Sequence, residues 1–366
     1  MSKNSLEIRR HKYFQLSSQI AQFDNAQLRS LLDNSWSNES STGWGMHHVI
    51  ILEESKVFVK RVPVTNLEYD NLFSTKNLYG LPTHYNYGIG STPGLGVFRE
   101  LVTHIKTTQW VLEEAIATFP LMYHYRIIPL CETCADVEID MKRWGNNANI
   151  KNYVLDRANA NYELVLVLEY IPYMLETWLR ENPNKLQQPF NELCMAIAFL
   201  RTKGIIHFDA HFRNVLTDGE QTYLTDFGLV LDKSFALTKE EESFFEQNTF
   251  YDYGEVLRNL GHLIRWSYDS CSENDKRRIL EKYGIKEGQP SYKIGAILLD
   301  NIEQIYADGD MNLDEFYVAS IVKYRSLITL MQDFFSEMWG NSKKDTKLPH
   351  EKLQLLLKET GFLPTP

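Results

Sequence analysis

Residues 204–232, GIIHFDAHFRNVLTDGEQTYLTDFGLVLD, constrain the fold more than any other part of the chain. Two short apolar runs flank an Asp-Gly dipeptide, which favours a tight turn between antiparallel strands. Such a hairpin brings Asn214, before its first strand, close to Asp226, after its second. Asp209 lies in the loop that leads to Asn214. The stretch therefore predicts two carboxylates and one carboxamide gathered at the open end of a hairpin.

These three side chains suit a divalent cation and a reacting hydroxyl. An aspartate at the end of a loop can reach a substrate hydroxyl and accept its proton. Mg²⁺ favours one or two carboxylates together with phosphate oxygens, and Asn214 would add a neutral oxygen ligand. The alternative is a polar surface loop with a helix-capping asparagine. The Asp226-Phe-Gly triplet, twelve residues after Asn214, favours the site.

Strand patterns crowd the first half of the chain and helical patterns fill the second. Residues 48–52 and 56–62 are β-branched runs that predict a hairpin, and 163–170 (ELVLVLEY) predicts a buried strand. Residues 98–117 have apolar positions at helical spacing without glycine or proline. After residue 250 the pattern is helical.

This asymmetry predicts an α+β fold with two lobes. The boundaries are a strand-rich N-lobe over residues 1–170 and a helical C-lobe over 171–366. Residues 63–98 and 131–160 read as insertions in the N-lobe, the first because it is rich in proline and glycine. A ligand cleft is expected between the two lobes.

Composition excludes several classes of protein. A hydrophobic fraction of 43% and an aromatic fraction of 13% suit a folded core. The net charge of −10 argues against a general nucleic-acid binder, which would carry a basic patch. No run of about 20 apolar residues predicts a membrane span. With only four cysteines and no secretory pattern at the N-terminus, a reducing cytoplasm is the expected location.

The order His207-x-Asp209-x₄-Asn214, followed by Asp226-Phe-Gly, resembles the catalytic and metal-binding loops of the protein-kinase-like superfamily. The resemblance covers roughly residues 40–265. Within it, several stretches look like a bacterial group called serine/threonine kinases, and so does the C-terminal stretch. These stretches are 57–65, 78–90, 119–129 and 331–357. The resemblance implies a bilobal kinase fold that uses ATP and Mg²⁺, with Asp209 as catalytic residue and Asn214 and Asp226 as metal ligands.

The same resemblance assigns residues of the N-lobe. Lys60 ends Val-Phe-Val-Lys, which is similar to the kinase strand whose lysine binds the α- and β-phosphates. Glu100 opens the next long helix and is expected to pair with Lys60. Gly43 and Gly45 stand where a glycine-rich turn would let backbone N–H groups approach phosphates. An ordinary turn is the alternative for these glycines.

Two further parts of the pattern concern the nucleotide base and the loop itself. Glu169 and Ile171 follow the buried strand and resemble the hinge, whose backbone would bind the adenine edge. His207 is expected to brace the loop through hydrogen bonds to backbone. Asp252 resembles the buried aspartate that supports this loop in kinases, with a helix N-cap as the alternative.

The nature of the acceptor stays open at this level. The order Asp209-Ala-His211 resembles the loop of aminoglycoside phosphotransferases, in which His211 could donate a hydrogen bond to the transferred phosphate. No Ala-Pro-Glu triplet ends the segment after residue 228. The prediction is an ATP-dependent kinase whose acceptor is a serine or threonine of a protein. A small-molecule kinase, a pseudokinase scaffold and an AMP-transferring enzyme are the alternatives.

Two motifs are interpreted as structural. Residues 308–314 echo a calcium loop, but Leu313 and Ala319 replace its glycine and its bidentate glutamate. This stretch is therefore expected to be a helix-capping loop. Cys131 and Cys134 form a CxxC that lacks the second ligand pair of a zinc site.

Overall fold

The computed structural model describes residues 3–33, 36–37, 45–90, 92–130, 143–286 and 288–363. Over these residues, the largest sheet is antiparallel with the strand order β1-β2-β3-β5-β4. Its strands are β1 (Trp36–Ser37), β2 (Met46–Leu52), β3 (Ser55–Val64), β4 (Met122–Pro129) and β5 (Tyr162–Glu169). The buried strand predicted over 163–170 is thus β5, which lies inside this sheet with β3 and β4 as its neighbours.

The hairpin predicted from residues 48–52 and 56–62 is confirmed, and its turn is unusually tight for a turn made of two glutamates. Leu52 pairs with Ser55, so only Glu53 and Glu54 connect β2 to β3. Both glutamates have positive φ angles, 44° and 66°. A two-residue turn that matches the twist of its strands requires such angles, although glycine and asparagine adopt them more easily. The strong strand pattern on both sides therefore dictates the turn.

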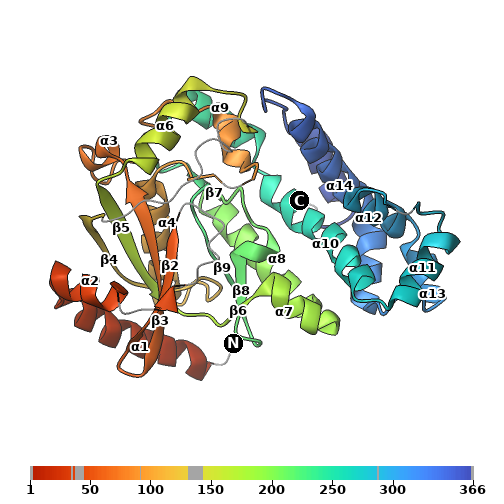
Figure 1. The fold of residues 1–366 in the computed structure, drawn as a ribbon, viewed down its shortest axis with the longest axis horizontal. Coiled ribbons are helices and arrows are strands. Elements are labelled where there is room, and N and C mark those ends of the chain that lie inside the picture. Colours follow the sequence, from red (N-terminus) through yellow and green to blue (C-terminus); the bar gives the residue numbers. More distant parts are fainter. Residues whose placement is uncertain are drawn as a thin grey trace.

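Both faces of this sheet are apolar. Successive residues of a strand point to opposite sides, so an uninterrupted apolar run supplies apolar side chains to both faces. Val57 and Val59 of β3 belong to one buried cluster with Leu16 and Ile20 of α1 (Lys3–Ala21). The other face forms a second cluster with α4 (Val97–Leu112). In Figure 1, α1 and α2 (Asn25–Asp33) lie beside the sheet, away from the helices of the C-terminal half.

The helix predicted over 98–117 ends earlier than expected, at Leu112. The chain after it leaves the helical path to contact the C-terminal half. Gln221 Nε2 donates to Ala117 O at 2.6 Å, and Leu224 N donates to Thr118 O at 2.9 Å. These interactions replace the last turns of the expected helix.

The two proposed insertions are only partly irregular. The first, 63–98, begins within the last residues of β3 and ends within the first residues of α4. Between them it holds α3 (Asn66–Tyr69) and a 3₁₀ turn, η1 (Thr83–Tyr87), and its other described residues are loop. Of the second, residues 131–142, including Cys131 and Cys134, lie outside the described residues. The remainder contains α6 (Ala148–Ala158), which begins where the Asn147 side chain accepts hydrogen bonds from two backbone N–H groups.

The C-terminal half is helical around two small sheets. One sheet has the order β6-β8-β9 and the other pairs β10 with β7. The strands are β6 (Tyr173–Met174), β7 (Ile205–Ile206), β8 (Val215–Thr217), β9 (Thr222–Leu224) and β10 (Leu231–Asp232). The helices and 3₁₀ turns up to residue 250 are α7 (Leu175–Glu181), η2 (Pro183–Lys185), α8 (Gln187–Thr202), η3 (Phe212–Asn214) and α9 (Lys239–Gln247). Those after it are α10 (Tyr251–Asp269), α11 (Glu273–Lys282), α12 (Ser291–Asp300), α13 (Ile302–Ala307), α14 (Glu315–Gly340) and α15 (His350–Glu359).

The long helices α10 and α14 pack closely (Figure 1). Helix α10 also contacts the loop of Asp209, through Asp252. A Cβ atom on Gly254 would lie 2.6 Å from Met331 Sδ, and one on Gly261 would lie 2.9 Å from Ile328 Cγ2. Glycine therefore permits the contact at both positions. The fold is α+β with two lobes, as predicted. No helix in the described ranges is both long and apolar enough to cross a membrane.

Candidate active site

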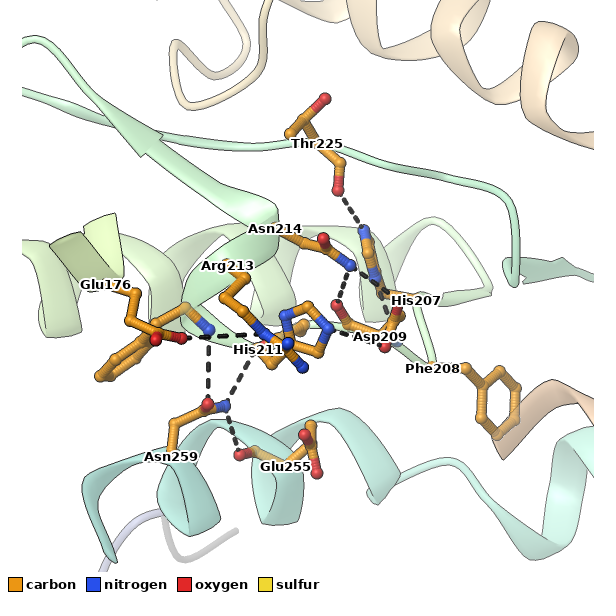
Figure 2. A network of polar contacts seen from close by, with 12 residues as sticks. Glu176, His207, Phe208, Asp209, His211, Arg213, Asn214, Thr225, Glu255 and Asn259 are labelled. Carbon is orange, nitrogen blue, oxygen red and sulfur yellow. Dashed lines mark hydrogen bonds and ion pairs between the residues drawn. The ribbon is translucent and has the colours of Figure 1, made fainter. Parts of the chain in front are cut away.

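The loop from β7 to β8 brings Asp209 and Asn214 together (Figure 2). Asn214 Nδ2 donates to Asp209 Oδ2 at 2.7 Å and to the Asp209 carbonyl oxygen at 3.0 Å. Because the amide nitrogen makes these bonds, the Oδ1 atom of Asn214 remains as the ligating atom of the side chain. Thr225 N donates to Asn214 O at 2.9 Å, which ties the loop to the residue before Asp226.

His207 braces this loop, as expected from its position. Asp209 N donates to His207 Nδ1 at 3.2 Å, so the ring accepts at Nδ1. The proton is then on Nε2, which donates to the Thr225 carbonyl oxygen at 3.1 Å. The ring is fully buried, and burial lowers its pKa to about 4. His207 is therefore neutral at physiological pH and joins the two loops by hydrogen bonds.

This buried histidine predicts a loss of stability in acid. An unfolded chain protonates His207 near its ordinary pKa of 6.5, whereas the folded chain does so near 4. Its contribution to the free energy of unfolding is therefore complete above pH 6.5 and declines by up to about 3 kcal/mol as the pH falls to 4. Denaturant titrations of the wild type and His207→Asn between pH 7 and pH 4 test this. The variant should be less stable at pH 7 and lose less on acidification; parallel curves would contradict the assignment.

Asp252, in the first turn of α10, supports the same loop from below. Its carboxylate accepts from His207 N at 2.7 Å and from Phe208 N at 2.8 Å. These bonds hold Phe208 in a left-handed conformation with φ 64°, which costs energy for a residue with a side chain. Burial raises the pKa of Asp252 to about 7. The N-cap of α10 is Phe250, so the capping alternative for Asp252 is wrong.

Asn259 is a second support that the sequence reasoning missed. Its Oδ1 accepts from Phe212 N at 3.3 Å, and its Nδ2 donates to the Ala210 carbonyl oxygen at 3.3 Å (Figure 2). Asn259 lies seven residues after Asp252 and so falls on the same face of α10. That spacing is the signal from which the asparagine could have been found.

Lys60 joins three segments that are far apart in the sequence. Its Nζ lies 2.6 Å from Glu100 Oε1 and 2.9 Å from Asp226 Oδ1. The predicted pair of Lys60 and Glu100 is therefore present. Burial opposes the charged form of the lysine, but Asp226 and Glu100 outweigh it and raise the pKa of Lys60. Burial also opposes ionisation of Asp226, and Lys60 overcomes this to lower the pKa of Asp226.

The donor set fits a magnesium ion bound together with phosphates. Asp226 has a left-handed backbone, φ 63°, and its side chain is 42% exposed although Oδ1 contacts Lys60. Asp226 and Asn214 would hold the ion. No group of three His, Cys, Asp or Glu side chains that could hold a metal occurs in the described part of the chain. Mg²⁺ takes few protein ligands and relies on phosphate oxygens and water for the rest, so one carboxylate and one carboxamide would suit it.

The helix that carries Glu100 is fixed to the C-terminal half by its neighbour Arg99. Arg99 Nη2 lies 2.6 Å from Glu241 Oε1 of α9, and the two side chains are only 1% and 2% exposed. Arg99 Nε also donates to the Thr75 carbonyl oxygen at 2.9 Å. Glu241 additionally completes a capping box with Thr238 at the start of α9. The position of α4, and with it Glu100, therefore depends on a buried ion pair.

The expected nucleotide-binding residues are only partly visible. Gly43 lies outside the described residues. A Cβ atom on Gly45 would lie 3.6 Å from Lys60 Cε, so this backbone passes close to the lysine side chain. The Glu169 side chain is occupied, because Arg9 Nε and Nη2 donate to its two oxygens at 2.9 and 2.7 Å. The Glu169 N–H is engaged as well, because it donates to the Leu121 carbonyl oxygen at 2.8 Å. A base would therefore contact the Glu169 carbonyl oxygen or the backbone of Ile171.

Arg9 was not anticipated as part of this region. Beyond Glu169, it donates to the carbonyl oxygens of Ala117 and Phe119 at 2.9 and 2.7 Å. Its guanidinium also lies 5.0 Å from the centre of the Tyr223 ring on β9. Helix α1 is therefore linked to both halves of the molecule through one side chain.

His211 lies on the other side of Asp209 from the amide of Asn214. Its Nε2 is 3.3 Å from Asp209 Oδ1, and the two side chains are 20% and 25% exposed. Both are thus accessible to a ligand. Burial raises the pKa of Asp209, and the nearby charge of Asp226 acts in the same direction, while His211 opposes them.

The stretch that echoes a calcium loop is a helix cap, as interpreted. Asp314 is the N-cap of α14 and accepts from Tyr317 N at 3.0 Å. Asp308 and Asp310 both bind Lys282 Nζ, at 2.6 and 2.5 Å. Their carboxylates are therefore paired with a cation of the protein itself.

Comparison with known proteins agrees with this geometry. A family model described as protein tyrosine and serine/threonine kinase matches residues 137–248, which include the loop of Asp209 and the Asp226-Phe-Gly triplet. Kinase suppressor of Ras A from Caenorhabditis elegans is 25% identical over 124 residues. The aligned stretch is 32% of this chain and 16% of that relative. These matches support the protein-kinase-like superfamily, and the fold is the bilobal fold of that class.

Proposed function

We propose that this protein is a phosphotransferase that uses Mg²⁺ and ATP and moves the γ-phosphate to a hydroxyl group. The observation that carries the proposal is the convergence of five side chains from four segments. They are Lys60, Glu100, Asp209, Asn214 and Asp226. The fold thus gathers a lysine with its glutamate partner, two potential metal ligands and a candidate base, and the family match covers the last three.

Each side chain has a role that its surroundings support. Lys60 would bind the α- and β-phosphates, and Glu100 would hold Lys60 in place. Asn214 and Asp226 would hold Mg²⁺, which when bound neutralises charge on the phosphates. Asp209 would orient the acceptor hydroxyl and take its proton. The raised pKa of Asp209 makes it a stronger base than an exposed aspartate.

The nucleotide base would contact the backbone at Glu169 and Ile171, and Gly43 and Gly45 would belong to the turn that covers the phosphates. For the acceptor, the family match supports a hydroxyl side chain of a protein, and we propose serine or threonine from the sequence resemblance. The short distance between His211 and Asp209 favours a second candidate, a small-molecule alcohol, because an imidazole there could donate to the transferred phosphate.

Transfer of label from γ-³²P-ATP tests the proposal directly. With Mg²⁺ we expect label on a mixed basic-protein substrate or on a panel of aminoglycosides and choline-like alcohols. Adding EDTA should reduce transfer to background, and excess Mg²⁺ should restore it. The reason is that Asn214 and Asp226 would hold the phosphates only through the ion. Label from α-³²P-ATP on the acceptor would show AMP transfer instead. Nucleotide binding without transfer to any acceptor would indicate a scaffold.

A further inference from the structure

Part of the proposed N-lobe insertion crosses into the C-terminal half and reaches Asp209. We call residues 83–90 and 92–96 the crossing segment. It begins with η1, in which Tyr85, Asn86 and Tyr87 are at most 4% exposed. Tyr87 OH donates to Asn248 Oδ1 at 2.8 Å, and the Tyr87 ring contacts the ring of Phe208 in the catalytic loop. A segment that precedes α4 in sequence is therefore anchored in the core beneath the site.

The crossing segment also binds the chain that follows the metal-binding triplet. Leu95 N donates to the Gly228 carbonyl oxygen at 2.9 Å, and Asn86 Nδ2 donates to the Leu229 carbonyl oxygen at 3.0 Å. The backbones approach closely enough that a Cβ atom on Gly94 would lie 2.8 Å from Gly228 O. These contacts fix the crossing segment against residues 228–229, so it cannot be treated as a loose surface loop.

The segment comes nearest to the proposed chemistry at Gly88. A Cβ atom there would collide with Leu229 Cδ1 and lie 3.7 Å from Asp209 Oδ1. Gly88 has φ 59°, which glycine adopts without strain. The same Oδ1 atom lies 3.3 Å from His211 Nε2, whereas Oδ2 is bonded to Asn214. The Asp209 oxygen that does not bind Asn214 is therefore bordered by His211 and by the Gly88 backbone.

We propose that the crossing segment is the acceptor-side wall of the site and that Gly88 determines which acceptors reach Asp209. This inference rests on the phosphotransferase function proposed above. A hydroxyl can approach Oδ1 of Asp209 end-on, but the rest of the acceptor cannot extend past Gly88, because the wall occupies that space. The acceptor is thus an alcohol whose hydroxyl projects from the end of a compact or protruding group. It is either a compact molecule or a single protruding serine or threonine, and not an extended peptide lying across residues 228–229.

Gly88→Ala tests the wall at its narrowest point. We expect it to raise the KM for the acceptor, or lower kcat/KM, by about tenfold or more, because a small displacement of a reacting group is costly. Affinity for Mg²⁺-ATP, measured by titration with a fluorescent ATP analogue, should stay within about twofold. The matched control is Gly284→Ala, since Gly284 has φ 66° and a Cβ atom there would meet nothing within 4 Å. A control as impaired as Gly88→Ala, or unaltered acceptor kinetics in Gly88→Ala, would overturn the proposal.

A second variant keeps the test informative if Gly88→Ala fails to fold. Leu229→Ala removes the side chain that packs beside Gly88 and should widen the approach to Asp209. Wild type and variant are then given γ-³²P-ATP with compact alcohols, a folded protein with serine on a surface turn, and an unstructured serine peptide. We expect the wild type to label one of the first two and the variant to gain transfer to the peptide. Efficient labelling of the peptide by the wild type would contradict the proposal that the crossing segment is a wall, but not the phosphotransferase function. No label on any acceptor would instead count against the phosphotransferase function.

Discussion

Replacing Asp209 with asparagine is expected to slow phosphoryl transfer by about 10²- to 10⁴-fold, the usual contribution of a positioned general base. The carboxamide keeps an oxygen that can accept from Asn214 Nδ2, so the loop should retain its shape. It cannot take the proton of the acceptor hydroxyl. Initial rates with labelled ATP, together with calorimetric titration of Mg²⁺-ATP, separate the loss of chemistry from a loss of binding.

Asp300→Asn is the control for this substitution, because Asp300 is an exposed aspartate at the end of α12. It should behave as the wild type. A rate for Asp209→Asn within about threefold of the wild type would show that Asp209 is not the base. The pseudokinase alternative would gain support if the wild type itself transferred no phosphate and the biological effect of the protein persisted in Asp209→Asn.

The second large effect concerns stability, through the buried pair of Arg99 and Glu241. Replacing Arg99 with methionine should lower the free energy of unfolding by about 3–5 kcal/mol, because it leaves the Glu241 carboxylate buried without its cation. Urea titration at pH 7 measures the change. The same variant should transfer phosphate more slowly than its folded fraction accounts for, since Arg99 fixes the helix that carries Glu100.

Two further variants identify the cause of the loss of stability. Combining Arg99→Met with Glu241→Gln should recover part of the stability, because the amide removes the unpaired charge and can still cap α9. Lys233→Met breaks the exposed pair of Lys233 and Glu246, and should cost less than about 1 kcal/mol. If the double variant is no more stable than the single one, the loss comes from packing and not from the buried charge.

Much of the fold could be predicted because it rests on local patterns. The β-branched runs of β2 and β3, the apolar run of β5 and the turn before β9 each encode a strand or hairpin within a few residues. Boundaries were less predictable where a tertiary contact or a permitted proline intervened. Helix α8 starts at Gln187 although Pro189 follows two residues later, because proline is tolerated in the first turn of a helix.

For the candidate site, the residue types and their order in the loop indicated which side chains to look for. The Lys60–Glu100 pair followed from the same pattern, and the structure contains it. Their roles in catalysis stay predictions until variants are assayed. The supports were harder to foresee, because Arg9 and Glu169 are separated by 160 residues and no local pattern pairs them. The crossing segment was identified as an insertion, but its route to Asp209 depends on buried aromatic contacts that only the folded chain reveals.

The apolar character of both sheet faces has a practical consequence for handling this protein. Residues 137–248, which match the kinase family, contain β5 but neither of its neighbours in the sheet. A chain trimmed to that stretch would display unpaired strand edges and uncovered valine and leucine side chains, a combination that promotes self-association. Trimming only α1 and α2 would uncover the sheet where these helices contact β4 and β2, and would remove the Arg9 link. Such shortened chains should be recovered mainly as aggregates, so domain boundaries for expression belong outside the first helix.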